Sequence, residues 1–284
     1  MENMKRKIIW TTLTALLFVN IFVWSVVFAA GDNELTVSFL NVGQGDAMFI
    51  EAPNGNQMLI DAGPNKNVLS ELGRIMPFWD RSIDIVLATH PDKDHIGGLP
   101  EILKRYDVNY IFETDVKSDT AVFEEFDTRA DSSDAQRISA RAGQILWLDS
   151  DVYIQILFPD RNVSGLEANA ASVIARLVYG ETEFMLTGDS PKSIENYLAA
   201  SYGEGLQSDV LKLGHHGSKT STSELFLGYV SPALAIISAG KENRYGHPHE
   251  EVMSIIEKFG IENESTKNGT VTIVSDGVDV RIKK

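Results

Sequence analysis

The order of apolar and polar residues from position 34 onward predicts alternating strands and helices. Residues 35–40 alternate between apolar and polar side chains, which is typical of a half-buried strand, and the mostly apolar run 83–88 indicates a buried one. Residues 99–106 repeat apolar side chains at helical spacing and predict an amphipathic helix. Further strands are expected at 47–50, 57–60, 108–112, 152–158, 172–178, 183–187, 209–213 and 233–238 and within 261–282, and further helices from 191 onward, at 223–229 and at 249–259.

The segment 113–144 interrupts this alternation. It is polar, acidic and weakly periodic, so we expect helical or loop-like excursions there rather than part of the core. The sequence has no internal repeat at the spacing of solenoid proteins and no linker between globular parts. The order of elements therefore predicts one α/β domain with mixed sheets, which covers residues 34–284.

The first thirty residues differ in kind from the rest. Lys5–Lys7 precede 23 uncharged residues, 8–30, which as a helix would be roughly 34 Å long and would span a bilayer. The basic residues predict an N-terminus that stays in the cytoplasm. Residues 27–30 resemble a signal-peptidase site, so residues 1–30 are either a signal peptide or a retained transmembrane anchor, with a buried core helix as the remaining alternative. The first two predict an extracytoplasmic domain, secreted or anchored to the cell membrane through residues 8–30.

Composition limits the chemistry of any site. The 284-residue chain has no cysteine, so a metal ion must be held by His, Asp, Glu or backbone oxygen. Residues 31–284 contain 22 basic and 39 acidic side chains, which gives a net charge of −17. Such a surface disfavours broad, sequence-independent binding of nucleic acid by phosphate neutralisation, although it leaves room for a local electropositive cleft.

Candidate metal ligands are concentrated at the end of the buried strand 83–88. The loop after it offers two imidazoles and two carboxylates within six residues, at the place where open α/β sheets position their sites. Such ligands suit Zn²⁺ or Mn²⁺. The alternative is a solvated polar loop that caps the next helix. A calcium-binding EF-hand is disfavoured, because it needs oxygen ligands across twelve positions and does not use histidines. The candidate ligands are His90, Asp92, Asp94 and His95.

Three later strand ends carry side chains of the same kinds, flanked by Gly or Pro. Jointly with the first cluster they can supply a two-metal centre, in which two ions lower the pKa of a bridging water and stabilise the attacking and leaving oxygens. Taken alone, an aspartate here could instead cap the following helix, and a histidine could begin one. These residues are Asp189, the pair His215 and His216, and the pair His247 and His249.

Five motifs, in this order, resemble the metallo-β-lactamase superfamily, in particular the exported hydrolase domain of ComEC-type DNA-uptake proteins. They are Phe39–Ala47 (FLNVGQGDA), His90–Gly98 (HPDKDHIGG), Leu186–Asp189 (LTGD), His215–Ser221 (HHGSKTS) and Asn243–Pro248 (NRYGHP). The resemblance covers residues 34–284. It implies a four-layer αββα sandwich, a single domain after the N-terminal hydrophobic segment, and a metal-dependent hydrolase with one or two divalent ions, Zn²⁺ or Mn²⁺.

The resemblance also implies the metal ligands. One ion, which orients the attacking water, would be held by Asp94, His95, Asp189 and His215, and its neighbour by His90, Asp92 and Asp189. In the superfamily pattern, H-x-H-x-D-H is followed by a middle His, a bridging Asp and a last His. Here Asp92 replaces the second His, and no His lies near Asn169–Ser172, where the middle one would fall. One metal position is therefore poor in ligands, and the harder carboxylate tilts the preference from Zn²⁺ toward Mn²⁺.

Further roles follow from the same resemblance. The candidates for catalysis are Asp94, His216 and His247, of which the two histidines would bind the scissile group or protonate the leaving oxygen. Asp46 and Asp61 would orient ligand imidazoles. A basic rim for a phosphate, with ordinary solvated surface as the alternative, would consist of Lys219, Lys241 and Arg244.

The resemblance thus implies an exported hydrolase of phosphodiesters, a nuclease that degrades one strand of DNA during uptake. The substrate would be a phosphoester, namely single-stranded DNA. The partner would be a separate DNA channel protein. Two alternatives stay open. One is a hydrolase of a small or cell-wall phosphoester or lactone, which the acidic charge favours. The other is a membrane-tethered binding module with a degenerate site.

Overall fold

The computed structural model describes residues 2–29 and 34–283, which belong to two separate units. The first unit contains one helix, α1 (Glu2–Ala29), whose segment Met4–Val23 is long and apolar enough to cross a membrane. Signal sequences share these properties, so the choice between a signal peptide and an anchor stays a prediction. Ala30, the last residue of the predicted cleavage site, lies outside the described residues.

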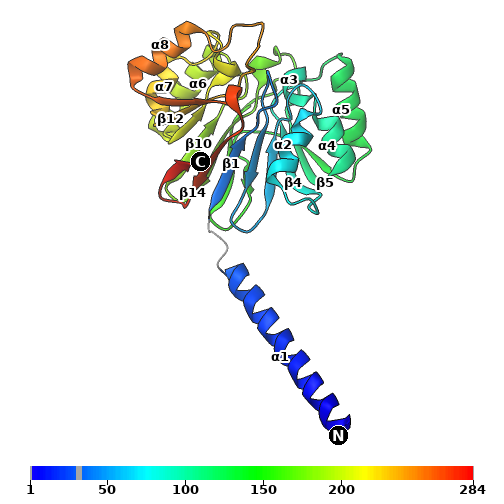
Figure 1. Ribbon diagram of the computed structural model, residues 1–284. Helices are drawn as coiled ribbons and strands as arrows, with labels where there is room; N and C mark the ends of the chain where they lie inside the picture. Colours follow the sequence, from blue (N-terminus) through cyan, green and yellow to red (C-terminus); the bar gives the residue numbers. More distant parts are fainter. Residues whose placement is uncertain (1, 30–33, 284) are drawn as a thin grey trace. The chain divides into compact units, whose positions relative to one another are not determined.

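Two sheets form the middle of the second unit (Figure 1). The first sheet has eight strands, in the spatial order β15 (Val280–Ile282), β14 (Val271–Ser275), β1 (Leu35–Phe39), β2 (Met48–Glu51), β3 (Gln57–Ile60), β4 (Ser82–Ala88), β5 (Asp107–Glu113) and β6 (Gln136–Ser139). The second has seven, in the order β13 (Glu262–Ser265), β12 (Leu234–Ile237), β11 (Val210–Lys212), β10 (Thr182–Leu186), β9 (Ile174–Tyr179), β8 (Val152–Phe158) and β7 (Ile145–Trp147).

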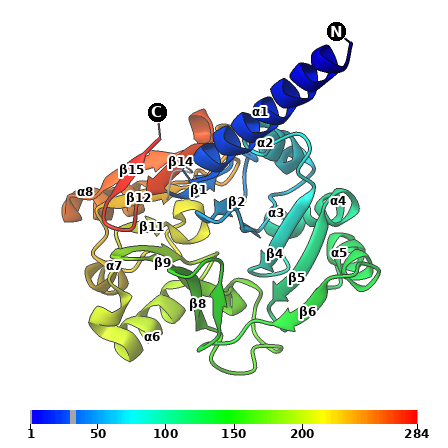
Figure 2. The ribbon, with the colours of Figure 1, turned by 90° about the horizontal axis from the view of Figure 1, so that it is seen from below.

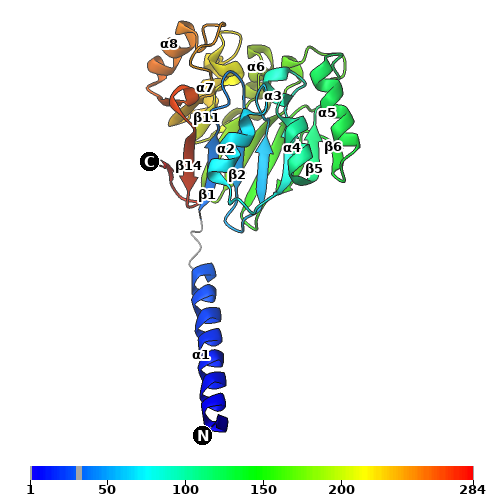
Figure 3. The same ribbon diagram turned by 45° about the vertical axis from the view of Figure 1, so that its right-hand side comes forward.

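Helices cover the outer face of each sheet (Figures 2 and 3). The first sheet carries α2 (Asn67–Ile75), α3 (Lys93–Ile96), α4 (Leu99–Arg105) and α5 (Ala121–Asp131), and the second carries α6 (Lys192–Tyr202), α7 (Glu224–Val230) and α8 (Glu250–Phe259). Because each sheet buries one face against its partner and the other against helices, three apolar layers form. The predicted four-layer αββα sandwich is confirmed.

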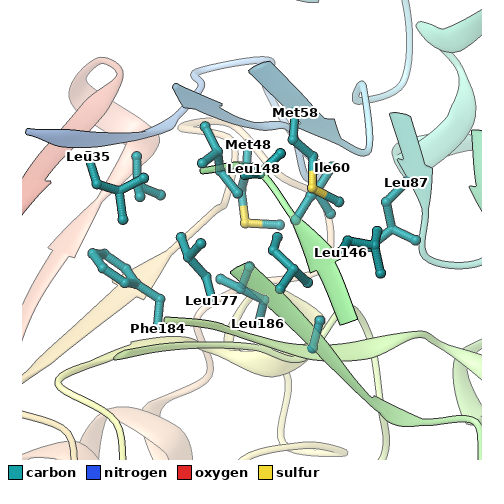
Figure 4. Close-up of a cluster of buried hydrophobic side chains, with 14 of the residues drawn as sticks. Leu35, Met48, Met58, Ile60, Leu87, Leu146, Leu148, Leu177, Phe184 and Leu186 are labelled. Atoms are coloured by element: carbon teal, nitrogen blue, oxygen red, sulfur yellow. The ribbon is translucent and has the colours of Figure 1, made fainter. Parts of the chain in front are cut away.

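The central apolar layer lies between the two sheets (Figure 4). Met48 and Ile60 of the first sheet face this layer, and Phe184 and Leu186 of the second sheet enter it from the other side. These side chains are at most 3% exposed, and burying each apolar side chain of this size contributes about 1.5–3 kcal/mol. This layer holds the two sheets, and hence their strand ends, in a fixed relation.

The expectation that residues 113–144 lie outside the core is wrong. Helix α5 buries Phe123, Phe126 and Ala130 against the first sheet, and β6 adds a parallel strand to β5. These three apolar residues lie three and four positions apart, so they share one face of the helix while the acidic side chains occupy the other. The many charged residues around these three make the apolar face of the helix hard to recognise in the sequence.

Candidate metal centre

The candidate ligands lie where strands of both sheets end. In the first sheet β3 and β4 lead into Asp61 and the loop 89–95, and in the second β10 and β11 lead into Asp189 and the 3-10 turn η3 (Gly214–Gly217). The strands of each pair are parallel, so their carboxyl ends lie at one edge of the sheet. Backbone hydrogen bonds join the two sides, as where the N–H of Val173 donates to the carbonyl of Thr89 at 2.9 Å.

Asp94, His95, Asp189 and His216 form a compact group in which one ligand atom from each residue lies within 4.8 Å of the others. His95 Nε2 is 3.3 Å from Asp189 Oδ1. His216 Nε2 is 3.4 Å from Asp94 Oδ2 and 3.5 Å from Asp189 Oδ2. Each sheet supplies two of the four residues, so the site exists only where the sheets meet.

The atoms of this group fit a divalent cation. Among the described residues, His95 Nε2, His216 Nε2 and Asp189 Oδ1 are buried without a hydrogen-bond partner. Burying such polar atoms costs free energy unless they bind something. Imidazole nitrogens and carboxylate oxygens are the ligands that Zn²⁺ and Mn²⁺ accept. We infer that these residues fit the metal ion implied by the sequence.

The potential in the group is negative enough to hold positive charge. Burial lowers the pKa of His216, but Asp189 and Asp46 outweigh burial and raise this pKa to about 9. Burial likewise lowers the pKa of His95, and Asp189 and Asp61 reverse this and leave it well above its usual value. Since a metal ion competes with protons for the same nitrogens, the carboxylates that attract these protons also attract a cation.

Two aspartates lie beside the Nδ1 atoms of the group's imidazoles. Asp61 Oδ2 is 2.7 Å from His95 Nδ1, and the same carboxylate accepts hydrogen bonds from the backbone and hydroxyl of Thr89 at 2.8 and 2.7 Å. Asp46 Oδ1 lies 3.2 Å from His216 Nδ1. A carboxylate at Nδ1 leaves Nε2 free to bind metal. Both aspartates are fully buried, and their orienting role stays a prediction.

His90 and Asp92 lie beside the four-residue group. His90 Nε2 is buried without a partner and is 3.8 Å from Asp92 Oδ2. Burial, with a contribution from His95, lowers the pKa of His90 to about 3, so the ring is neutral at neutral pH and has a lone pair for a metal. The predicted second metal position is therefore built from fewer groups than the first.

The two adjacent histidines of η3 take different places. His216 is buried in the four-residue group, whereas His215 is more exposed, with Nε2 3.7 Å from Asp189 Oδ2 and Nδ1 3.0 Å from Thr220 Oγ1. Both have a left-handed backbone, with φ of 50° and 57°, so their side chains do not follow strand alternation. The sequence predicted His215 as a ligand and His216 as a catalytic residue; the structure places His216, rather than His215, in the compact group with Asp94, His95 and Asp189.

His247 lies next to these two imidazoles, with ring centroids 5.5 Å from His215 and 6.1 Å from His216. Burial and the neighbouring His216 lower its pKa to about 4. Gln44 Nε2 approaches His247 Nδ1 at 3.4 Å. The predicted basic residues Lys219, Lys241 and Arg244 are exposed on the flanking loops, and among the described residues no acidic side chain forms a salt bridge with them.

Lys212 is a residue of the site that sequence reasoning missed. Its side chain is fully buried, forms an ion pair with Asp46, donates to the carbonyl of Gly188 at 3.1 Å and lies 4.0 Å from Asp189 Oδ1. The signal was present in the sequence, because a lysine between Leu211 and Leu213 in an apolar strand has to find a buried partner. Lys212 is thus paired with the same carboxylate that lies beside His216.

The family model described as the metallo-beta-lactamase superfamily matches residues 40–241. The chain belongs to this superfamily. It is 31% identical to the ComE operon protein 3 of Bacillus subtilis, over 84% of this chain and 33% of that protein. It is 34% identical to the Recombination protein 2 of Haemophilus influenzae, over 81% of this chain and 27% of that protein. The chain thus spans about a third of these curated relatives.

Among solved structures, the metallo-beta-lactamase fold protein YhfI from Bacillus subtilis has a TM-score of 0.55 at 15% identity, covering 84% of this chain and 99% of that one. This likeness concerns the fold alone. Because sequence establishes the superfamily and the structure contains a group of residues that could hold a metal ion, the chain is a metal-dependent hydrolase of the metallo-beta-lactamase superfamily.

Ser172 stands beside the place where the superfamily's middle histidine is missing. Its hydroxyl is 3.4 Å from His90 Nδ1 and accepts a hydrogen bond from the backbone N–H of Asp189 at 3.2 Å. The preceding residues form the short turn η1 (Asn169–Ala171). Ser172 therefore contacts both His90 and Asp189.

Gly45→Ala is expected to lower activity at least tenfold and stability by about 1–3 kcal/mol, because overpacking forces the backbone to shift. A Cβ at Gly45 would lie 2.1 Å from the carbonyl oxygen of Asp94, and the backbone there has a φ of +137°. Gly43→Ala is the matched control, since Gly43 also has positive φ but a Cβ added there would meet no atom within 4 Å. Urea unfolding and kcat measure both effects; equal losses in the two variants would show that backbone strain alone matters.

Proposed function

We propose that the chain is an exported, metal-dependent phosphodiesterase that cleaves single-stranded DNA in a DNA-uptake system. The observation that carries this proposal is the compact group of Asp94, His95, Asp189 and His216, beside which lie two further imidazoles. The names of its relatives support the link to uptake, since one is the ComE operon protein 3 and another is the competence protein ComA of Neisseria gonorrhoeae. Both are longer proteins, so their activities stay proposals for this chain.

The assignment of residues follows their places in the structure. We propose Asp94, His95, Asp189 and His216 as ligands of the principal ion, and His90 and Asp92, with Asp189, as those of a weaker second position, with Zn²⁺ or Mn²⁺ as the metal. When bound, the ion supplies a Lewis acid and a water of lowered pKa. Asp61 and Asp46 hold the rings of His95 and His216 so that Nε2 points into the group.

The remaining side chains bind the phosphate. Burial, which Asp189 only partly opposes, lowers the pKa of His215, and the pKa of His247 is about 4, so both rings are neutral at neutral pH. The amide of Gln44 donates to His247 Nδ1, so the neutral ring carries its proton on Nε2 and donates a hydrogen bond from there to a phosphate oxygen. Lys219, Lys241 and Arg244 add positive charge on the flanking loops.

The place of the reaction follows from the N-terminus. Helix α1 supports export, either as a signal peptide or as an anchor in the cell membrane. Among the described residues, α1 is the only helix long and apolar enough to span a membrane. Since DNA has to cross a membrane during uptake, we propose a separate DNA channel protein as the partner.

A second candidate is the hydrolysis of a small or cell-wall phosphoester or lactone. The acidic composition, a net charge of −15 over the whole chain, favours it because a long polyanion is repelled by such a surface. A binding module with a degenerate site is disfavoured by the buried ligand atoms of His95, His216 and Asp189, which lie close together without forming a hydrogen bond.

These functions are separated by assaying the full-length chain, purified in detergent, after loading with Mn²⁺ or Zn²⁺. We expect bound metal by mass spectrometry, cleavage of single-stranded DNA and loss of cleavage with a chelator. Turnover of bis-p-nitrophenyl phosphate without cleavage of DNA would refute the nuclease and leave the small-ester hydrolase. A protein that neither binds a divalent ion nor responds to one would contradict both enzymatic functions.

A further inference from the structure

The loop 240–247, at the rim of the site, carries a column of stacked side chains. The rings of Tyr245 and His247 are 5.6 Å apart between centroids and inclined by only 20°. The guanidinium of Arg244 lies 5.1 Å from the centroid of the Tyr245 ring and donates to its hydroxyl at 3.0 Å. Half of Tyr245 remains exposed. Tyr245 thus contacts an imidazole of the site and keeps half of its surface open to solvent.

Hydrogen bonds fix this loop to the rest of the site. The Asn243 amide donates to the carbonyls of Gly240 and His247 at 2.9 and 2.8 Å and accepts from the N–H of His247 at 2.8 Å. Gln44 accepts from the N–H of Gly240 at 3.1 Å and contacts His247 Nδ1 at 3.4 Å. A platform held in this way loses little conformational entropy when a ligand stacks on it.

The distances place these side chains beside the four-residue group. The ring centroid of His247 is 6.1 Å from that of His216, a member of the four-residue group. The ring of Tyr245 contacts that of His247 directly. A phosphate bound at the group therefore has Tyr245 within the reach of an adjoining nucleotide. A single exposed tyrosine needs no explanation, but an aromatic ring stacked in line with the site and paired with an arginine is how proteins bind unpaired bases.

We propose that Arg244 and Tyr245 form a nucleobase subsite, in which the base next to the scissile phosphate stacks on Tyr245 while Arg244 contacts the base or the following phosphate. This proposal rests on the proposed cleavage of single-stranded DNA and names the part of the substrate that the site recognises. Stacking on an aromatic ring tolerates any base. The subsite therefore favours single strands, whose bases are unpaired, without selecting a sequence.

The test compares Tyr245→Ala and Tyr245→Phe in the full-length protein on two oligonucleotides of equal length, one with normal bases and one with abasic residues. We expect the ratio of kcat/KM for the normal over the abasic strand to fall about tenfold in Tyr245→Ala, as loss of one stacked base predicts, and to be kept in Tyr245→Phe. Tyr110→Ala, which removes a tyrosine that is 43% exposed on β5, is the matched control and should leave the ratio unchanged.

A binding measurement keeps the subsite separate from the nuclease activity. An oligonucleotide that contains 2-aminopurine loses fluorescence when this base stacks, so wild-type protein should quench it and Tyr245→Ala should not. Quenching that depends on Tyr245 without any cleavage would support the subsite and refute the nuclease. Cleavage with an unchanged ratio in Tyr245→Ala would overturn the subsite and leave the nuclease standing. If wild-type protein neither quenches nor cleaves, both proposals fail.

Discussion

Asp94→Ala is expected to abolish hydrolysis and to leave the fold intact. The Asp94 carboxylate lies 3.4 Å from His216 Nε2 in the four-residue group and is partly exposed, so its removal deletes a proposed ligand without opening a cavity in the core. A bound ion contributes several kcal/mol of transition-state stabilisation, which corresponds to a loss in kcat on the order of 10³-fold. The substrate that wild-type protein cleaves is used for the assay, together with metal analysis of both proteins.

Asp119→Ala is the matched control for this variant, because it removes an exposed carboxylate that precedes α5 and is distant in the chain from the site loops. The control should keep wild-type kcat and metal content. An Asp94→Ala protein that retains the wild-type rate would refute the assignment of the site, whatever its metal content.

Lys212→Met is expected to lower the free energy of unfolding by about 3 kcal/mol, because it removes the lysine of a buried ion pair and leaves the carboxylate of Asp46 to the imidazoles of His216 and His95. Methionine occupies a similar volume, so the effect is one of charge rather than of a cavity. Activity should fall as well, since Asp46 would no longer be held against His216 Nδ1. Urea unfolding with the protein in its metal-free form measures the stability change.

A double variant separates charge from packing at this pair. Lys212→Met with Asp46→Asn removes both charges and should recover most of the stability lost in the single variant, because a matched apolar or neutral pair avoids the buried, unpaired ion. Activity should not recover, since the orienting carboxylate is also gone. If Lys212→Met alone is as stable as the wild-type protein, the buried pair has no structural role.

The sequence predicted the architecture where local pattern and tertiary structure agree. The apolar run 83–88 and the polar residues that follow it indicated both a central strand and the site loop, because a buried strand has to end in a loop at the sheet edge. Helix α2 and the short strand β7 were not predicted. Three residues of β7 carry too little periodicity to separate a strand from a loop.

The site was predicted in outline, and its details depend on contacts that a linear pattern does not contain. Which of His215 and His216 points into the group depends on their backbone, because both residues are left-handed. Two such residues in succession break the strand alternation from which the direction of a side chain is predicted. The burial of Lys212 depends on its ion pair with Asp46, which lies 166 positions earlier in the chain. Asp46 lies between β1 and β2 of the first sheet, whereas Lys212 is in β11 of the second. Long-range ion pairs of this kind require the fold to be known.

The division of the four-residue group between two sheets would couple the proposed metal binding to folding. Asp94 and His95 are supplied by the first half of the chain, and Asp189 and His216 by the second. An unfolded chain therefore does not hold the four residues together, and an ion bound to only some of them exchanges readily. High-affinity capture has to wait until both sheets have packed, so a chain that crosses a membrane unfolded would arrive inert and acquire its catalytic ion at its destination.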